Sequence, residues 1–214
     1  MVPMSDNASQ LSPEGWENLD ALIRRVDEDR WLSSRYAAPE DRRKLIALYA
    51  LYYELAKVRL VTKEPGLAAI RFQWWRDALE EIRSESPVRR HEVALALAAT
   101  MENRQENLEG LIDGHARALE SGDRRDEPEA LLMRLASARL GATAWAGFET
   151  VAVHFAGGRR GVTGCAGEAV AKVPSVIRPA VAHGGLRHVY ARQSDPSPLA
   201  KRWAVLRAMM TGRV

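Results

Sequence analysis

The chain has 214 residues, and 46% of them are hydrophobic, which excludes a largely disordered protein. Its single cysteine, Cys165, excludes an internal disulfide and a zinc site with two or more cysteine ligands. The net charge is only +3, but residues 159–214 carry 10 Lys and Arg against 2 Asp and Glu, which indicates a polyanionic partner such as a membrane leaflet, a diphosphate or nucleic acid.

Three helices are predicted in the first part of the chain. Ser12 and Pro13 are typical of a helix start, and apolar residues recur behind them at helical spacing. A loop is expected over 33–38, and Pro39 begins a second helix whose broad apolar stripe predicts a central position. A third helix is predicted over 67–83, with Trp75 turned toward a second element. Its expected buried face consists of Leu67, Ile70, Trp74, Ala78 and Ile82.

The helical pattern continues in the second part of the chain. Ser86-Pro87 repeats the start signal, and apolar positions recur over 93–119 until Gly122. The longest pattern runs over 128–155, where Gly141 and Gly147 predict a bend. We expect it to end at Gly157-Gly158, followed by a short helix over 161–172 and a final helix over 199–210. The sequence therefore predicts a single all-α domain over residues 1–214.

No segment of the sequence has the length and hydrophobicity of a membrane span. The longest uncharged runs hold about nine residues, against the ~20 that a spanning helix needs. The first ten residues lack the basic and apolar regions of a signal peptide. We therefore expect a cytoplasmic protein, which can be peripheral on the cytoplasmic face of the inner membrane.

Several familiar site motifs are absent. The five histidines form neither a zinc-binding H-E-x-x-H nor a Glu-x-x-His pair, so no metal site is expected. The segment 157–161, GGRRG, lacks P-loop spacing and follows no predicted strand. We interpret it as a helix break with close helix contact rather than as a phosphate site, and Cys165 as a small buried packing residue. Nucleic-acid binding is not expected, because the basic residues are dispersed.

Three segments carry a resemblance to a known family: 49–59 (YALYYELAKVR), Glu64-Pro65, and 70–79 (IRFQWWRDAL). They resemble the squalene/phytoene synthase family, and more narrowly the branch that includes the phytoene-synthase-like assembly factor of mitochondrial respiratory complex I. The resemblance is specific over about residues 30–83 and weaker over about 104–214. It implies the all-α isoprenoid-synthase fold, here in a shortened form.

The same resemblance implies a departure from the enzymes of the family. Those enzymes bind Mg²⁺ and diphosphate through two aspartate-rich motifs on facing helices. The aspartates of the first motif align with Ala56, Lys57 and Leu60, and those of the second with Pro179 and His183. No carboxylate remains at these positions, although Mg²⁺ needs several oxygen ligands to neutralise a leaving diphosphate. The sequence therefore predicts that synthase chemistry is lost, with no catalytic residue, no metal ligand and no cofactor.

We accordingly expect a non-enzymatic, membrane-peripheral assembly factor with a protein partner in a respiratory-chain complex. An anionic membrane surface is a further expected partner. Two alternatives stay open. One is an isoprenoid-diphosphate transferase with unusual ligands, which would use Mg²⁺, and the other is a protein that binds an isoprenoid or another lipid.

Two groups of residues are candidates for these roles. The first group would line a cavity between the second and third helices: Glu54, Lys57, Arg59, Arg71, Gln73 and Trp75. For Glu54 and Lys57 the alternative is a solvated ion pair, and for Trp75 it is packing between helices. In the final helix, apolar residues 199, 203, 206 and 210 form a stripe that either closes the core or meets an anionic membrane. The candidate membrane contacts there are Lys201, Arg202, Trp203 and Arg207.

Overall fold

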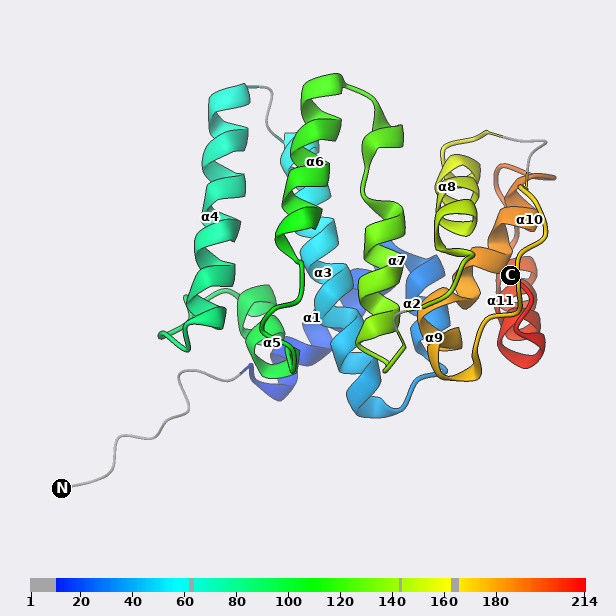
Figure 1. Ribbon diagram of the computed structural model, residues 1–214, viewed down its shortest axis with the longest axis horizontal. Helices are drawn as coiled ribbons and strands as arrows, with labels where there is room; N and C mark the ends of the chain where they lie inside the picture. Colours follow the sequence, from blue (N-terminus) through cyan, green and yellow to red (C-terminus); the bar gives the residue numbers. More distant parts are fainter. Residues whose placement is uncertain (1–10, 62–63, 143, 163–165) are drawn as a thin grey trace.

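The chain folds into helices that stand side by side (Figure 1). The computed structural model describes residues 11–61, 64–142, 144–162 and 166–214, and these ranges contain helices and no strand, which confirms the predicted all-α fold. In chain order the elements are α1 (Pro13–Val26), α2 (Glu28–Ser34), α3 (Pro39–Val61), α4 (Pro65–Arg83), α5 (Glu92–Thr100), α6 (Glu109–Ser121), η2 (Arg124–Asp126), α7 (Glu129–Ala138), α8 (Phe148–Arg159), η3 (Ser175–Ile177), α9 (Arg178–Val181), η4 (Ala182–Leu186), α10 (Arg187–Tyr190) and α11 (Pro198–Thr211).

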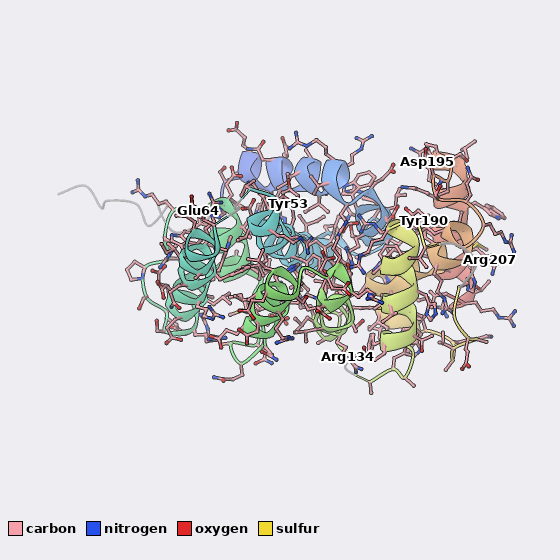
Figure 2. All side chains as sticks on the ribbon, turned by 90° about the horizontal axis from the view of Figure 1, so that it is seen from above. Tyr53, Glu64, Arg134, Tyr190, Asp195 and Arg207 are labelled. Carbon is pink, nitrogen blue, oxygen red and sulfur yellow. The ribbon has the colours of Figure 1, made fainter. Side chains whose placement is uncertain are left out.

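The helix α3 occupies the centre of the molecule, as its broad apolar stripe predicts. Every residue from Leu45 to Tyr52 is buried, so the helix is covered on all sides along two turns. Its neighbours α4, α6 and α7 run beside it, and α1 lies crosswise to them (Figures 1 and 2). The charged residues of α3 lie in its first turns and in its last third. The charged side chains of α3 are therefore confined to its two ends.

The prediction of a loop over 33–38 is wrong for its first residues. A short helix, α2, runs to Ser34, and it is separated from α1 only by Asp27. The Asp27 carboxylate accepts a hydrogen bond from the backbone N–H of Arg30 at 3.4 Å, which satisfies a free donor of the first turn. This cap places both Asp27 and Arg30 at the junction of α1 and α2.

The predicted facing of α4 is confirmed for Ala78 and Ile82 and wrong for the other three residues. Leu67 and Ile70 are exposed, Trp74 is only partly buried, and Trp75 is the tryptophan of the core at 4% exposure. The buried face comprises Ala68, Phe72, Trp75, Ala78, Leu79 and Ile82. Adjacent residues on a helix point about 100° apart, so an error of one position exchanges the roles of the two tryptophans.

Two of the predicted helices begin or break elsewhere. The start signal at Ser86-Pro87 opens no helix, because α5 begins only at Glu92. The long helix predicted over 128–155 is divided into α7 and α8 rather than bent. Between them, Gly141 adopts a φ of +96°, a left-handed conformation that glycine reaches without strain.

The glycine-rich segment after α8 differs from its prediction in two ways. Gly157 and Gly158 lie inside α8 and do not end it. A Cβ atom on Gly158 would stand 2.6 Å from the Cβ of Tyr190, so the predicted close contact is present. The described residues of 161–172 are not helical, and Ala171 instead accepts a hydrogen bond from the indole of Trp145 at 3.0 Å. Cys165 lies outside the described residues.

The final helix, α11, begins and ends within one residue of its prediction. Its buried face consists of Val205 and Ala208, which pack on η4. The apolar stripe that was expected either to close the core or to meet a membrane does not close the core, because Leu199, Trp203 and Met210 are 75%, 68% and 73% exposed. None of the described helices is both long enough and apolar enough to span a lipid bilayer.

Candidate functional site

The six residues expected to line one cavity are divided among three places. Glu54, Arg71 and Trp75 line a shallow pocket of about 200 Å³ between α3 and α4, together with Trp74 and His91. The rings of both tryptophans meet the His91 ring edge-on, with centroids 5.2–5.3 Å apart. Aromatic packing therefore leaves only a shallow pocket here.

Of the other three candidates, Lys57 stays beside this pocket and two lie elsewhere. The Lys57 ammonium pairs with Glu54 at 3.3 Å. Gln73 is exposed and donates a hydrogen bond to Asp77 at 2.8 Å, on the side of α4 that faces α6. Arg59 lies on a different side of α3. Its guanidinium belongs to a larger charged site that the sequence analysis did not assemble.

That site is a cavity of about 320 Å³ beside the C-terminal half of α3. Its walls come from the end of α1, from α2, from α3, from the η2 region, from the start of α7 and from the end of α8. We call it the arginine cavity. Its lining residues are Val26, Asp27, Arg30, Tyr49, Tyr52, Tyr53, Ala56, Arg59, Leu60, Arg124, Glu127, Glu129, Ala156, Arg159 and Arg160. Tyr53 is labelled in Figure 2.

The guanidinium of Arg30 lies at the base of the arginine cavity, and its side chain is 3% exposed. It forms ion pairs with Asp27 and with Glu129 at the start of α7. It also stacks over the ring of Tyr52 on α3, at 5.3 Å from the centroid. Burial favours the neutral form of Asp27, but Arg159 and Arg30 outweigh burial and hold the pKa of Asp27 below its ordinary value. Both partners therefore stay charged.

Glu127 is the hub of a second group of arginines. Its carboxylate pairs with Arg59 of α3, with Arg160 at 2.7 Å and with Arg124 at 3.1 Å. Burial raises the pKa of Glu127, but hydrogen bonds from Arg160 and Arg59 outweigh this effect and set the pKa at about 2. This carboxylate connects α3, η2 and the end of α8 through charge-assisted hydrogen bonds.

The network continues from α8 toward α11. Arg159 pairs with Asp27 at 3.0 Å and approaches Asp29 at 3.7 Å. Asp29 also pairs with Lys201 of α11 at 3.0 Å and accepts a hydrogen bond from the Tyr190 hydroxyl at 2.6 Å. Lys201, expected at a membrane contact, is thus committed to an internal carboxylate.

The positions aligned with the first aspartate-rich motif lie beside this network. Ala56 and Leu60 line the arginine cavity, while Lys57 faces Glu54 outside it. The positions aligned with the second motif, Pro179 and His183, are buried behind the cavity, where the His183 ring meets Phe155 at 4.9 Å. The described residues include no group of three side chains that could hold a metal ion.

This set of side chains does not fit a Mg²⁺ cluster. Each carboxylate that lines the cavity already accepts hydrogen bonds from at least one guanidinium. A divalent cation at the same oxygens would have to displace those arginines and would be repelled by the others. The cavity is organised to attract anions instead.

Two residues of this network, Arg59 and Lys201, were candidates from the sequence, although each was expected in a different place, and most of the others were missed. Arg159 and Arg160 were noticed in the segment GGRRG, but the segment was interpreted as a helix break. The available signal was a pair of arginines at the C-terminal end of a helix, on a chain whose terminal quarter is strongly basic. Nothing in the sequence shows that Arg30 and Glu127 meet them.

The candidate membrane contacts on α11 also separate into two kinds. Arg202, Trp203 and Arg207 are exposed, whereas Lys201 points inward. Trp203 lies between the exposed apolar residues Leu199 and Met210 along the helix. The exposed face of α11 is therefore apolar with basic residues beside it.

Comparisons with known proteins place the chain in a family. A model of the squalene/phytoene synthase family matches residues 23–133, which is just over half of the chain. Neither the comparison with curated proteins nor that with solved structures returned a match. The matched segment contains α2, α3 and α4, and with them Arg30, Arg59 and the positions aligned with the first aspartate-rich motif. The chain belongs to the squalene/phytoene synthase family.

Proposed function

We propose that this chain is a family member without synthase activity that acts at a membrane surface in the assembly of a respiratory-chain complex of the complex I type. One observation carries the first part of the proposal. The cavity beside Ala56 and Leu60 is lined by five arginines, and each of its three carboxylates is paired with arginine.

Synthase chemistry needs the opposite arrangement. Ionisation of an allylic diphosphate leaves a highly charged group, which is stabilised by Mg²⁺ ions held on several carboxylates. Electrostatic stabilisation of this kind is usually the largest catalytic contribution. In this chain, His183 and Pro179 provide no carboxylate, and Asp27 is held by Arg30 and Arg159.

The exposed face of α11 supports membrane contact. A helix with tryptophan on its apolar face and arginines beside it suits the boundary between headgroups and acyl chains. Arg202 and Arg207 can each add about 1 kcal/mol of attraction to an anionic leaflet. The assembly role is supported by the resemblance of residues 30–83 to the assembly-factor branch.

A turnover assay tests the loss of synthase chemistry. Purified protein with Mg²⁺ and farnesyl or geranylgeranyl diphosphate should release no diphosphate above the rate without protein. Turnover that is abolished by Glu54→Ala or Glu127→Gln would contradict the proposal, because both changes remove carboxylates near the aligned motif.

Vesicle co-sedimentation tests the membrane contact. Binding should require anionic lipid, weaken at high salt and fall at least several-fold in Trp203→Ser. The matched control is Val153→Ser, which removes a similarly exposed apolar residue from α8. Equal loss in both variants, or no loss in either, would contradict a contact through α11. Deletion of α11 is unsuitable as a test, because Val205, Ala208 and Lys201 join it to the core.

The assembly role is tested in cells that lack the gene. Those cells should lose assembled complex I, and the wild-type chain should restore it. The Trp203→Ser variant should restore it only in part. Normal complex I levels in cells without the gene would contradict the assembly role and leave the two biochemical tests unaffected.

A further inference from the structure

We propose that the arginine cavity binds a phosphate group directly, through arginine and tyrosine side chains and without a metal ion. The ligand class is a phosphate monoester dianion or a free phosphate. This inference goes beyond the proposed function, because it holds whether or not the chain contacts a membrane or assembles a complex.

The side chains that line the arginine cavity carry more positive than negative charge. Five arginines line it against three carboxylates. The arginines are Arg30, Arg59, Arg124, Arg159 and Arg160, and the carboxylates are Asp27, Glu127 and Glu129. Each arginine has a carboxylate partner, but the carboxylates are shared, so the lining keeps an excess of two positive charges. This excess favours an additional anion.

The protein leaves buried hydrogen-bond donors unused at this cavity. The Nη1 atom of Arg59 is buried and has no partner among the described residues. The hydroxyl of Tyr49 is buried and likewise lacks a partner there, whereas the buried hydroxyl of Tyr52 interacts with Glu129. Both tyrosines are less than 10% exposed, and all three side chains line the arginine cavity. Buried donors of this kind are normally satisfied, so they point to a ligand that accepts hydrogen bonds.

The protonation of these groups favours an anionic ligand. Burial raises the pKa of Tyr49 above its ordinary value, although Arg30 opposes this, so its hydroxyl stays a donor near neutral pH. Arginine stays charged at every physiological pH, and it offers donors in a planar fork that matches two oxygens of a phosphate. Donors on Tyr49 and Arg59 come from α3 and those on Arg160 from the residue that follows α8, so they reach the cavity from two sides, which suits the several oxygens of one phosphate group.

The cavity also has the dimensions and the entrance of a ligand site. Its volume of about 320 Å³ is within the range of small-molecule pockets. Leu60, which is 73% exposed, lies at its edge beside the exposed Arg124. A phosphate group can therefore enter as a free ion or as the headgroup of a lipid whose chain stays outside.

Calorimetric titration tests the proposal on the full chain. The probes are inorganic phosphate and pyrophosphate in a HEPES buffer of low salt with EDTA, and acetate is the control anion. We expect binding of one phosphate probe per chain that persists in EDTA and weakens at high salt, and no comparable binding of acetate. Glycerol 3-phosphate and monomeric lysophosphatidic acid separate the two sources. Equal affinity indicates a free phosphate compound, and tighter binding of the lipid indicates a headgroup.

Two variants locate the binding. Arg59→Gln should weaken phosphate binding by about tenfold or more, because it removes a charged donor. Tyr49→Phe should weaken it several-fold without harming the fold, because its hydroxyl has no partner in the protein. The matched controls are Arg89→Gln, which breaks the Glu81 pair away from the cavity, and Tyr36→Phe on the surface. Neither control should change the affinity.

Three results would overturn the proposal. One is the absence of heat and of thermal stabilisation with every phosphate probe. Another is binding that requires Mg²⁺ and disappears in EDTA. The third is binding that Tyr49→Phe and Arg59→Gln leave unchanged, which would place it elsewhere on the basic surface. If Arg59→Gln does not fold, Tyr49→Phe alone decides the location.

Discussion

Two arginine–carboxylate clusters in this molecule differ in whether all of their hydrogen-bond donors have partners. Arg139 and Glu106, near the opposite end of α3, form a closed pair in which the Nε and Nη2 atoms of Arg139 bind the carboxylate at 2.7–3.1 Å. The remaining nitrogen, Nη1, donates to the carbonyl of Lys44 at 2.9 Å. Every donor group of Arg139 is satisfied inside the protein.

In the arginine cavity, by contrast, not every hydrogen-bond donor has a partner among the described residues. Glu127 is shared by three arginines, and Arg59 keeps a buried nitrogen without a partner among the described residues. The closed pair needs no further partner, whereas an excess of positive charge with unused hydrogen-bond donors favours the binding of an anionic ligand. The comparison therefore separates a structural ion pair from a binding site.

The largest expected effect comes from breaking the closed pair. Arg139→Met leaves the Glu106 carboxylate buried without its partner, and it should lower the free energy of unfolding by about 3–5 kcal/mol. Urea unfolding monitored by circular dichroism measures this loss. The control Arg134→Met breaks an exposed pair with Glu149 and should cost less than about 1 kcal/mol. Equal small losses would show that the closed pair is not structural.

As the pH falls, the free energy of unfolding should decrease before the carboxylates of the arginine cavity become protonated. Burial lowers the pKa of His115 to about 4, and its ring packs against Tyr52 at 4.6 Å. Because this value lies below the 6.5 of an unfolded histidine, the unfolded chain takes up the proton first as the pH falls. The stability present above pH 6.5 is then lost, by about 2 kcal/mol at pH 5, and the loss from His115 levels off near pH 4.

Urea midpoints measured between pH 7.5 and pH 4 check this dependence. His115→Gln should flatten part of it, and the remainder should come from His183, His91 and His188, whose pKa values burial also lowers. A wild-type stability that rises as the pH falls from 6.5 to 5 would contradict the placement of neutral histidines beside the arginines.

A smaller change in stability is expected when one arginine is removed from the arginine cavity. Arg59→Met removes one of three partners of Glu127, which keeps Arg160 and Arg124, and it reduces the excess of positive charge. The free energy of unfolding should therefore change by no more than about 1 kcal/mol. A loss as large as that of Arg139→Met would show that the cavity arginines are structural and would remove the contrast.

The smallest effect should follow from Tyr49→Phe. The hydroxyl has no partner among the described residues, so its removal deletes no internal hydrogen bond, and the ring keeps its packing. We expect a change within about 0.5 kcal/mol, in either direction. A loss above 2 kcal/mol in the same unfolding assay would reveal an internal partner for this hydroxyl.

Much of the fold could be predicted because the signals are local. Pro39 and a broad apolar stripe predict α3. The helix α6 ends at Gly122, which adopts the left-handed conformation that glycine favours at a helix end. The prediction of which α4 residues are buried was partly wrong, because only one of the two neighbouring tryptophans is fully buried. The sequence alone does not show which one. Gly141 and Gly147 predict a bend between α7 and α8, but the packing around Trp145 in the segment that divides the two helices does not follow from the local sequence.

The candidate site could be predicted only in fragments. Spacing along α3 placed Arg59 among polar residues, but helical periodicity does not show which distant elements meet it. Arg30 and Glu127 are 97 residues apart in the sequence, and they line one cavity only because α2 packs beside α3 while η2 packs on α6 and α8. The positions aligned with the first motif indicate where the cavity lies. Which arginines line it follows only from the three-dimensional structure.

The central claim is that arginines have taken the place of metal ligands in this cavity. Electron paramagnetic resonance of Mn²⁺, which prefers the same oxygen ligands as Mg²⁺, tests it most directly. With micromolar Mn²⁺ and pyrophosphate, an equimolar addition of the protein should leave the signal of free Mn²⁺ undiminished, or raise it as pyrophosphate moves to the protein. A fall in that signal in proportion to the added protein, abolished by Glu127→Gln, would show a carboxylate metal site and contradict the account.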